Sequence, residues 1–402
     1  MKMLNQQVIK ENNLKQIFSM IADHKGISRA RLAAATGLSK STVSVLVEEL
    51  LEQGYLIDEG TVNVGGQGRK PNSLRVNGEG NRIAVIHWHR KRMHLGLVGL
   101  DGKMDHFRSR MFAQEEDYVE QIVSAYRNLT ASLEVGGGSP RILGLCFLVP
   151  GMVDASRERL VSSVLQLKPN AWVLKRLRSA IADVPMAFFN DTACFAYAEK
   201  IRHGIDERPS AFVNMSGGVG AVLFQAGEML RGAAGMTTQF GHLSVVRGGM
   251  LCQCGNRGCL EGRIGEKALT ERAKDFLSQQ ELAAAGEITY ERIGSRADMG
   301  DREYQHLAAA LAEDLAFALG SLISIYNVDR VILGGRAGNL GNFFLEALQK
   351  RLRVSGFREF VSVCEVKYSR VPEHGGYEGA ARYFMDRHYQ FSEDMSGKLI
   401  LK

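Results

Sequence analysis

The sequence predicts an N-terminal all-α domain of winged helix-turn-helix type over residues 1–80 and a larger α/β body over residues 81–402. Near the N-terminus, apolar residues recur at helical spacing behind serine caps. From residue 81 onward, short apolar strands alternate with helices. Within the body, one histidine and three cysteines cluster between residues 242 and 259, which indicates a metal site.

Length and composition are those of a soluble protein with two or three domains. The 402 residues are 45% hydrophobic and 23% charged, and the formal net charge is +6. The first 80 residues hold ten Lys or Arg against eight Asp or Glu, so a DNA-binding prediction rests on local geometry. The N-terminus lacks a signal-peptide core, and no apolar run approaches the length that spans a bilayer. We expect a cytoplasmic protein without membrane insertion, whose thiols stay reduced.

Three helices are predicted in the N-terminal domain. Asn12 or Asn13 is expected to cap the first helix, which Gly26 ends. Ser28 caps a second helix over residues 29–36. A glycine turn and the cap Ser39 lead into the third. Two helices joined by a short glycine turn form a helix-turn-helix. The apolar residues at helical spacing are Leu14, Ile17, Phe18, Ile21, Val43, Leu46, Val47, Leu50 and Leu51.

The start of the third helix carries polar residues of the kinds that contact base edges in the major groove. These residues are Ser39, Lys40, Ser41, Thr42 and Ser44. An ordinary helical hairpin with polar caps is the alternative interpretation, and the segment that follows weighs against it.

That segment predicts a wing and a basic strip. Residues 54–60 and 61–64 read as the two short strands of the wing. Residues 65–71 place Arg69 and Lys70 between glycines and a proline, with no hydrophobic anchor. Such a strip resembles an AT-hook and can enter a narrow A·T minor groove, where negative potential attracts cations. A solvated interdomain linker is the alternative, but behind a winged helix-turn-helix we favour DNA contact.

Strands and helices alternate through the body. The predicted strands are 83–86, 95–100, 142–149, 186–189, 211–215, 221–224 and 331–335, and the main helices are 118–133 and 304–326. The first two strands form a hairpin closed by a charged turn. Cys146, Cys194 and Cys364 lie in apolar segments and are expected to be small core residues.

The metal cluster consists of His242, Cys252, Cys254 and Cys259. Three thiolates and one imidazole complete a tetrahedral zinc set and leave no open position for water, which is typical of a structural site. Gly255 and Gly258 let the backbone turn tightly enough for the second and third cysteines to converge. Unrelated thiols near a histidine are the alternative, but isolated thiols rarely show this spacing. We expect one structural zinc ion per chain.

These motifs, in this order, resemble those of the ROK family, named for repressors, open reading frames and sugar kinases. The resemblance is carried by residues 232–235 (Gly-Ala-Ala-Gly), Gly241-His242, the cysteine cluster through Glu261, residues 150–154 (Pro-Gly-Met-Val-Asp), Asn190-Asp191, residues 217–220 and Gly334-Gly335. With the N-terminal domain, the chain resembles regulators of the NagC/Mlc/XylR type. The resemblance implies an actin-like (ribonuclease H-like) body of two α/β lobes, 81–190 and 191–402, with a sugar between them.

By the same resemblance, Asn190, Asp191, Gln239, His242 and Glu261 are expected to contact the sugar. Asp191 stands at the position of the kinase general base, and such a carboxylate can also bind a hydroxyl without reaction. Taken alone, an Asn-Asp pair is more often a helix cap. His242 would present one ring nitrogen to zinc and the other to the sugar. Gln239 replaces the usual family Glu, so the ligand can differ from glucose or an N-acetylhexosamine.

Two segments argue against kinase activity. Residues Ile86–Met93 stand where ROK kinases carry an Asp-x-Gly-Gly-Thr type turn, yet they contain neither a carboxylate nor a glycine. Ser216-Gly217-Gly218 stands where the family usually has Gly-Thr-Gly. Phosphoryl transfer needs backbone amides and a metal to neutralise the phosphates, so productive ATP binding is not expected. The basic turn reads as a solvated loop, or as a surface for DNA phosphates or a protein partner.

We therefore expect a sugar-responsive transcriptional regulator, a repressor of carbohydrate uptake or catabolism genes. A homodimer or tetramer would bind a palindromic double-stranded operator, and a sugar or sugar phosphate would be the effector. The alternatives are a ROK sugar kinase with an appended DNA-binding head and a regulator controlled by a protein partner.

Overall fold

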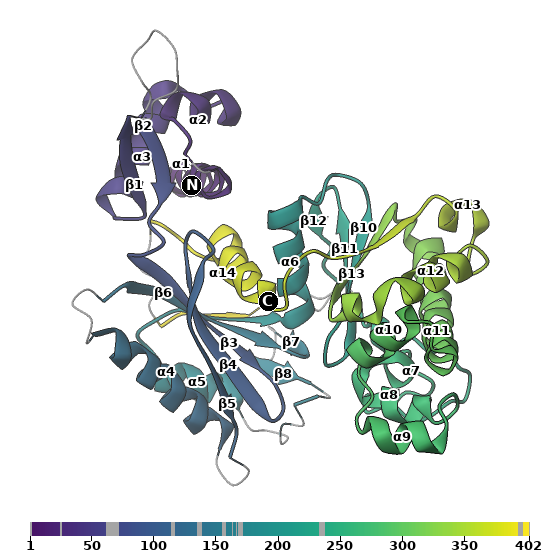
Figure 1. Cartoon of the computed structure of the whole chain (residues 1–402). Helices are drawn as coiled ribbons and strands as arrows, with labels where there is room; N and C mark the ends of the chain where they lie inside the picture. Colours follow the sequence, from purple (N-terminus) through teal and green to yellow (C-terminus); the bar gives the residue numbers. More distant parts are fainter. Residues whose placement is uncertain are drawn as a thin grey trace.

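The N-terminal residues form a helical head at one end of the molecule in the computed structural model (Figure 1). The structure describes residues 2–24, 26–61, 72–113, 117–134, 139–154, 158–162, 164–165, 167, 172–232, 238–392 and 397–401. The head contains helices α1 (Lys2–Asp23), α2 (Arg29–Thr36) and α3 (Lys40–Glu52). Its core consists of the apolar residues predicted from helical spacing, among them Leu14, Ile17, Phe18, Ile21, Val43, Leu46, Val47 and Leu50.

Two of the three predicted helix starts are confirmed. Ser28 Oγ accepts a hydrogen bond from Arg31 N at 3.4 Å, and Ser39 Oγ accepts one from Thr42 N at 3.1 Å. The predicted cap at Asn12 or Asn13 is wrong, because α1 begins at Lys2 and contains both residues. The upstream segment has no glycine or proline and consists largely of good helix formers, so the helix extends through it.

The wing has one strand where it was predicted and one elsewhere. Strand β1 (Leu56–Thr61) pairs antiparallel with β2 (Asn72–Val76), a strand that was not predicted. Beyond Thr61, the predicted return strand at 61–64 lies outside the described residues. Leu74 and Val76 are buried in the head, and Leu74 N donates to Ile27 O at 3.1 Å. This long-range burial, which the local pattern does not reveal, selects β2. Arg69 and Lys70 fall between the two strands in sequence and lie outside the described residues.

The first lobe is built on a six-stranded sheet of order β15-β9-β6-β3-β4-β5. Its strands are β3 (Asn81–Trp88), β4 (Arg92–Gly99), β5 (Met104–Met111), β6 (Arg141–Val149), β9 (Met186–Asn190) and β15 (Leu399–Leu401). Alternate residues face opposite sides, as the period of a strand requires. Ala84 and Ile86 pack with α4 (Tyr118–Glu134) and α5 (Val173–Ala180), whereas the other side of the sheet packs on α14 (Gly375–Arg387).

The C-terminal end of the chain returns to this first sheet. Leu399 pairs with Met186 in the parallel ladder of β15 and β9, and α14 covers the same lobe. The range 191–402 for the second lobe therefore needs correction at its C-terminal end. A three-residue strand is too short to show a period in the sequence, and its partner lies more than two hundred residues upstream.

The second lobe has a five-stranded sheet of order β12-β11-β10-β13-β14. Its strands are β10 (Ser210–Met215), β11 (Val219–Gln225), β12 (Glu228–Met229), β13 (Arg330–Gly335) and β14 (Glu365–Tyr368). Its helices are α7 (Glu261–Ile264), α8 (Glu266–Ala273), α9 (Gln279–Ala285), α10 (Tyr290–Asp298), α11 (Arg302–Tyr326), α12 (Gly341–Leu352) and α13 (Arg358–Val361), with 3₁₀ turns η1 (Phe240–His242) and η2 (Ala337–Leu340). The apolar helix α11 is long enough to span a bilayer, but more than half of its most apolar segment is buried here as a core helix.

Helix α6 (Asp191–His203) lies between the two sheets. Cys194 and Tyr197 pack in the core of the first lobe, while Phe195 and Ala196 pack against β10, β11 and β13 of the second. A short hairpin of β7 (Met152–Asp154) and β8 (Arg159–Val161) lies near the start of α6 (Figure 1). The lobes are thus joined through one helix whose first residue is Asp191.

Candidate functional site

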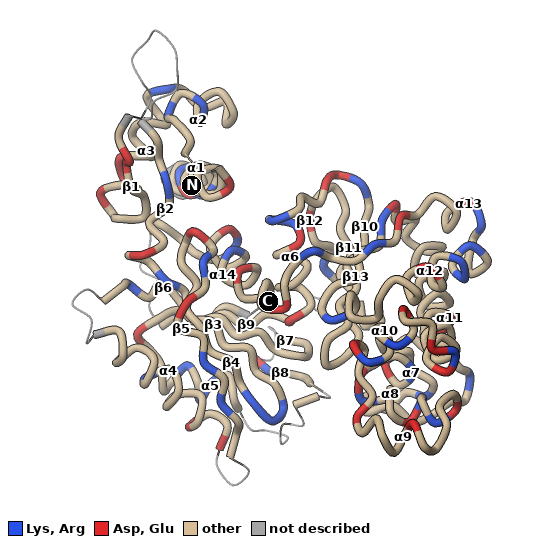
Figure 2. Tube along the Cα trace, viewed as in Figure 1, with Lys and Arg blue, Asp and Glu red and all other residues tan. Residues whose placement is uncertain are grey.

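The N-terminal end of α3 presents a cluster of exposed hydroxyl and ammonium groups. Its members are Ser39, Lys40, Ser41 and Ser44, all exposed, and the partly exposed Thr42. Ser39 Oγ lies 2.8 Å from both Ser41 Oγ and Thr42 Oγ1. Figure 2 shows basic residues on the neighbouring helix α2, which carries Arg29 and Arg31. In helix-turn-helix proteins generally, the N-terminal end of the second helix of the motif contacts base edges in the major groove. The cluster lies at the corresponding end of α3.

The four residues of the cysteine and histidine cluster converge as predicted. One ligand atom from each of His242, Cys252, Cys254 and Cys259 lies within 4.8 Å of the others. Cys254 Sγ and Cys259 Sγ are 3.8 Å apart. Two sulfurs bound tetrahedrally to one zinc ion at about 2.3 Å lie roughly 3.8 Å apart, so this spacing fits a shared ion. The cluster is consistent with a metal site.

The backbone around the cluster explains its convergence. Gly258 has φ 72°, and a Cβ there would lie 1.8 Å from Val246 O, so only glycine fits this turn. Asn256 Nδ2 donates to His242 O at 3.1 Å, tying the histidine to the cysteine loop. His242 Nδ1 lies 3.6 Å from Cys252 Sγ, which leaves Nε2 as the ring nitrogen for another partner.

Asn190 and Asp191 join β9 to α6. Asn190 Oδ1 accepts from Ala193 N at 3.2 Å as the N-cap, and its Nδ2 donates to Gly151 O at 3.0 Å. Both polar groups of Asn190 are therefore engaged in the protein. Asp191 Oδ1 accepts from Thr192 N at 2.7 Å, while Oδ2 lies 4.0 Å from His87 Nε2. Burial raises the pKa of Asp191 to about 6, against hydrogen bonds to Thr192 that lower it.

Glu261 and Gln239 flank the metal cluster in different ways. Glu261 Oε2 accepts from Val219 N at 2.9 Å, and a Cβ on Gly218 would lie 2.5 Å from the same oxygen. Glycine at 218 therefore lets the carboxylate reach the backbone of the glycine loop. Gln239 is exposed, and its backbone carbonyl accepts from His242 N at 2.8 Å. Of the predicted sugar residues, Glu261 acts on Asp191 electrostatically, since its charge also raises the pKa of Asp191.

The β3–β4 hairpin differs from the expected charged turn. Strand pairing continues through His87 and Trp88, which lie opposite His94 and Met93, so only residues 89–91 form the turn. Figure 2 shows that turn as a basic segment, and Arg90, Lys91 and Arg92 are exposed. Trp88 is fully buried and His87 is 7% exposed. Because His87 and Trp88 stand next to a run of cations, the sequence pattern did not indicate that they are buried.

His87 was not predicted as a site residue. Its ring centroid lies 3.9 Å from that of His89 and about as far from Phe195 as from Tyr377, at 6.3 and 6.0 Å. Burial lowers the pKa of His87 well below its usual value, and the nearby His89, His94 and His374 lower it further. The imidazole is therefore neutral at neutral pH. The single sequence signal for it was an alternation of His and apolar residues at 86–89.

Comparison with known proteins gives the family. The ROK family profile matches residues 86–387. The chain belongs to the ROK family. The MarR family profile matches residues 15–62, which cover the C-terminal part of α1, all of α2 and α3, and β1.

Relatives by sequence include a repressor and a DNA-binding transcriptional regulator. The xylose repressor of Caldicellulosiruptor bescii is 28% identical over 368 residues, covering 88% of this chain and 90% of that protein. The DNA-binding transcriptional dual regulator NagC of Escherichia coli is 21% identical over 368 residues, covering 89% and 88%.

Solved structures show the same fold. A ROK family transcriptional regulator, a homologue of the E. coli Mlc protein, has a TM-score of 0.78 at 21% identity and covers 94% of this chain and 96% of its own. A ROK glucokinase from Streptomyces griseus, bound to glucose and AMPPNP, has a TM-score of 0.62 at 22% identity and covers 75% and 98%. The actin-like, two-lobed ROK body is thus shared by regulators and kinases.

In this ROK chain, Arg382 of α14 joins the body to the head. Its guanidinium donates to Ser19 Oγ at 2.7 Å, pairs with Asp23 Oδ1 at 2.9 Å and donates to Asp386 at 2.9 Å. Asp386 also accepts from Tyr197 OH of α6 at 2.7 Å. One charged network therefore links α1, α14 and α6. Its members are so far apart in the sequence that local patterns could not predict their contact.

The residues after α14 extend this junction. Glu11 accepts hydrogen bonds from Phe391 N at 3.0 Å and Ser392 Oγ at 2.8 Å. Tyr55 OH and Tyr389 OH lie 2.6 Å apart. The head thus rests on α14 and on the segment that leaves it.

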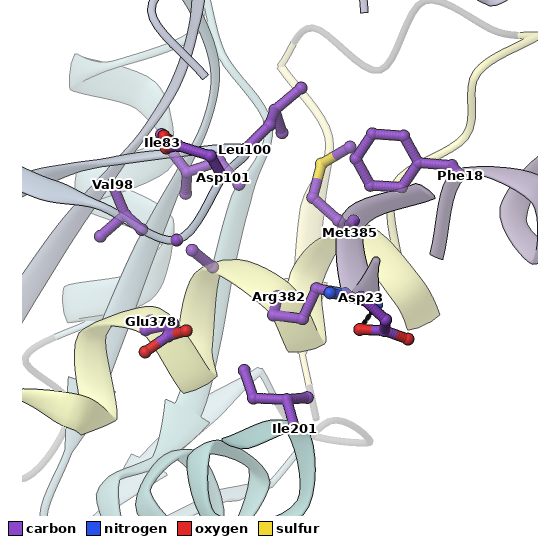
Figure 3. Close-up of a pocket in the computed structure, with 14 residues that line it drawn as sticks. Phe18, Asp23, Ile83, Val98, Leu100, Asp101, Ile201, Glu378, Arg382 and Met385 are labelled. Atoms are coloured by element: carbon purple, nitrogen blue, oxygen red, sulfur yellow. Dashed lines mark ion pairs between the residues drawn. The ribbon is translucent and has the colours of Figure 1, made fainter. Parts of the chain in front are cut away.

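A cavity of about 120 Å³ lies in the junction beside Arg382 (Figure 3). Phe18 and Asp23 line it from the head, Val98 and Leu100 from β4 and the turn that follows it, and Met385 from α14. Figure 3 shows the ion pair of Asp23 with Arg382 at its edge. The junction is therefore held by specific polar contacts around a cavity that its side chains leave open, in contrast to a close-packed interior.

Proposed function

We propose that this ROK protein is a sugar-responsive transcriptional repressor of carbohydrate uptake or catabolism genes, acting in the cytoplasm. One observation carries the proposal: residues that match the MarR family profile precede a ROK body, in which the proposed sugar contacts include the carboxylates of Asp191 and Glu261. The names of the xylose repressor and NagC, to which the chain is similar over most of its length, support the same function.

The head would bind a double-stranded operator. In this proposal, the cluster at the start of α3 (Ser39, Lys40, Ser41, Thr42 and Ser44) enters the major groove, and Arg69 and Lys70 reach the adjacent minor groove. A homodimer, or a tetramer built from dimers, would place two such helices roughly 34 Å apart on a pseudo-palindromic site.

The metal site would hold one structural zinc ion through His242, Cys252, Cys254 and Cys259. The donor set and the 3.8 Å spacing of two sulfurs fit zinc. The ion would supply a rigid cross-link and no reaction chemistry. Asn256 and the glycine turn at Gly258 would keep the loop in place around it.

The effector would be a sugar or sugar derivative held by Asp191, Glu261 and His242 Nε2, with Asn190 and Gln239 beside them. Asn190 would act mainly by orienting the start of α6, since its side chain already caps that helix. Exposed Gln239 brings amide donors where a carboxylate would only accept, which favours an effector group that offers acceptors.

The effect of sugar binding would be transmitted to the head through helices α6 and α14. Asp191 is the first residue of α6, α6 packs on α14, and Arg382 of α14 holds α1. A change in the angle between the lobes would shift α6, because this helix packs against both sheets. The sugar alters DNA binding only if it binds the two arrangements with different affinity.

Kinase activity is the second candidate, because glucokinases share the body fold. We propose that it is absent, since residues Ile86–Met93 offer bulky cations where phosphates would need backbone amides and a metal. Incubation of the full chain with radiolabelled ATP, magnesium and a hexose panel tests this. Turnover at kinase-like rates would contradict the proposal.

A thermal-shift series tests the proposed function itself. The full-length, zinc-loaded protein is melted with D-xylose, D-glucose, N-acetyl-D-glucosamine and their phosphates. We expect at least one compound to raise Tm in a saturable way, because a ligand specific to the folded state stabilises it. If no sugar does so, while a protein from lysate binds the full chain and changes its DNA affinity, a partner-controlled regulator replaces the sugar-controlled one.

A further inference from the structure

Among the described residues, His87 has a buried nitrogen without a partner. Nε2 makes no hydrogen bond there, and the side chain is 9% exposed. A buried polar atom left unsatisfied costs about 1–3 kcal/mol, so such an atom needs an explanation. A carboxylate of the proposed sugar site, that of Asp191, lies close to this nitrogen.

The distance between the two groups suggests what fits between them. Nε2 and Asp191 Oδ2 are 4.0 Å apart, too far for a direct hydrogen bond. One oxygen atom about 2.8 Å from each would bridge them with an angle of roughly 90° at that oxygen. The neutral imidazole can donate from Nε2, and the carboxylate can only accept. The bridging group must therefore both donate and accept, as a hydroxyl does.

The surroundings fix the imidazole in this position. The ring of His89 lies against it, with the centroids 3.9 Å apart and the planes tilted by 40°, and the rings of Phe195 and Tyr377 lie 6.3 and 6.0 Å away. Since Phe195 belongs to α6 and Tyr377 to α14, the ring is enclosed by the helices of the proposed signalling path. His87 cannot turn away to solvent without leaving this packing.

We propose that His87 Nε2 and Asp191 Oδ2 together hold one free hydroxyl of the effector sugar, which makes His87 a specificity-determining residue. This inference rests on the proposed function. The hydroxyl donates its proton to Asp191 and accepts from His87. A phosphoryl group on that hydroxyl would remove the proton and place negative charge beside the carboxylate, so the effector is unphosphorylated at this position.

Titration calorimetry with full-length variants tests the inference, using whichever of D-xylose, D-glucose and N-acetyl-D-glucosamine raises the Tm of the wild type. His87→Phe keeps a ring and removes the nitrogens, and we expect it to weaken binding about tenfold or more. His87→Gln restores a donor and should recover part of the loss. The matched control is His89→Phe, which alters the neighbouring ring and should change the affinity less than about threefold.

Monodeoxy derivatives of the same sugar separate a direct contact from a structural role. In wild type, one derivative should bind about tenfold more weakly than the parent, and in His87→Phe this difference should shrink to less than about threefold, because only the contact with Asp191 remains. If the losses from deoxygenation and from His87→Phe simply multiply for every hydroxyl, the inference is overturned and the proposed function stands. If no sugar binds the wild type, both fail. Should His87→Phe not fold, His87→Met, which also lacks a hydrogen-bond donor, gives the same decision with the same derivatives.

Discussion

Helix α14 has two faces that are built differently. Toward α6, the backbones touch through glycines: a Cβ on Gly379 would lie 1.9 Å from Cys194 O, and one on Gly376 would lie 2.9 Å from the Phe195 ring. Toward α1, side chains bridge the gap, with Arg382 bonded to Ser19 and Asp23 beside a cavity of about 120 Å³. The contact between α14 and α6 leaves no room for the two helices to change their spacing. The contact between α14 and α1 consists of side-chain hydrogen bonds and an ion pair, which can break and form again. A shift of α6 would therefore move α14 with it as one unit. The contact between α14 and α1 would then change, and the position of the head with it.

The largest expected effect is on the close-packed face. Gly379→Ala should cost about 3 kcal/mol of unfolding free energy, because its Cβ must displace a backbone carbonyl and no flexible side chain can yield instead. Urea denaturation measures it. Gly338→Ala is the matched control, since nothing lies within 4 Å of its added Cβ, and it should cost less than about 0.5 kcal/mol. Equal costs for the two variants would show that α6 and α14 are not rigidly packed.

The polar face should respond to Arg382→Ala. The change leaves Asp386, whose side chain is 12% exposed, without its cation, and we expect a loss of about 2 kcal/mol together with faster proteolysis of the head. Arg176→Ala removes an exposed pair with Asp117 and should cost less than about 1 kcal/mol. If the head of Arg382→Ala is cleaved at the wild-type rate, contacts other than those of Arg382 hold the head against the body.

The start of α6 should show a pH dependence. Burial raises the pKa of Asp191 from its usual value to about 6, so the native state favours the protonated carboxyl. The stability that this group contributes is complete below pH 4 and is lost as the pH rises through 6. Asp191→Asn does not titrate, so its stability relative to wild type should improve by about 2 kcal/mol between pH 4 and pH 7. If the difference in stability between Asp191→Asn and wild type stays constant from pH 4 to pH 7, burial does not raise the pKa of Asp191.

The smallest expected effect is at the edge of the junction. Tyr55→Phe removes the hydroxyl that lies 2.6 Å from Tyr389 OH and should cost about 1 kcal/mol. Tyr326→Phe, at a position that is 46% exposed, should be neutral in the same urea titration. If the two variants behave alike, the tyrosine pair does not help to dock the head.

Much of the fold was predictable because its signals are local. Ser28 and Ser39 cap helices through residues three positions away, and the four metal ligands lie within eighteen residues of one another. Spacing and residue type alone suffice for such features. The family motifs then supplied Asp191 and Glu261 as candidates.

The remainder depends on contacts distant in sequence. Strand β2 is selected by burial against Ile27, and β15 by pairing with β9. His87 looked like part of a charged turn, yet packing by α6 and α14 buries it. Arg382 resembles any surface cation of an amphipathic helix until α1 is placed beside it. In each case the deciding partner is more than forty residues away.

The most direct test of the account compares the DNA response of wild type and Arg382→Ala to the effector. Fluorescence anisotropy follows a duplex that the full-length protein selects from a random library, titrated with the sugar that raises its Tm. We predict that the sugar weakens DNA binding by wild type at least about tenfold. Arg382→Ala should bind the same sugar and the same DNA, yet respond less than about twofold. A variant that responds as strongly as wild type would contradict the claim that α14 carries the signal from the sugar site to the head.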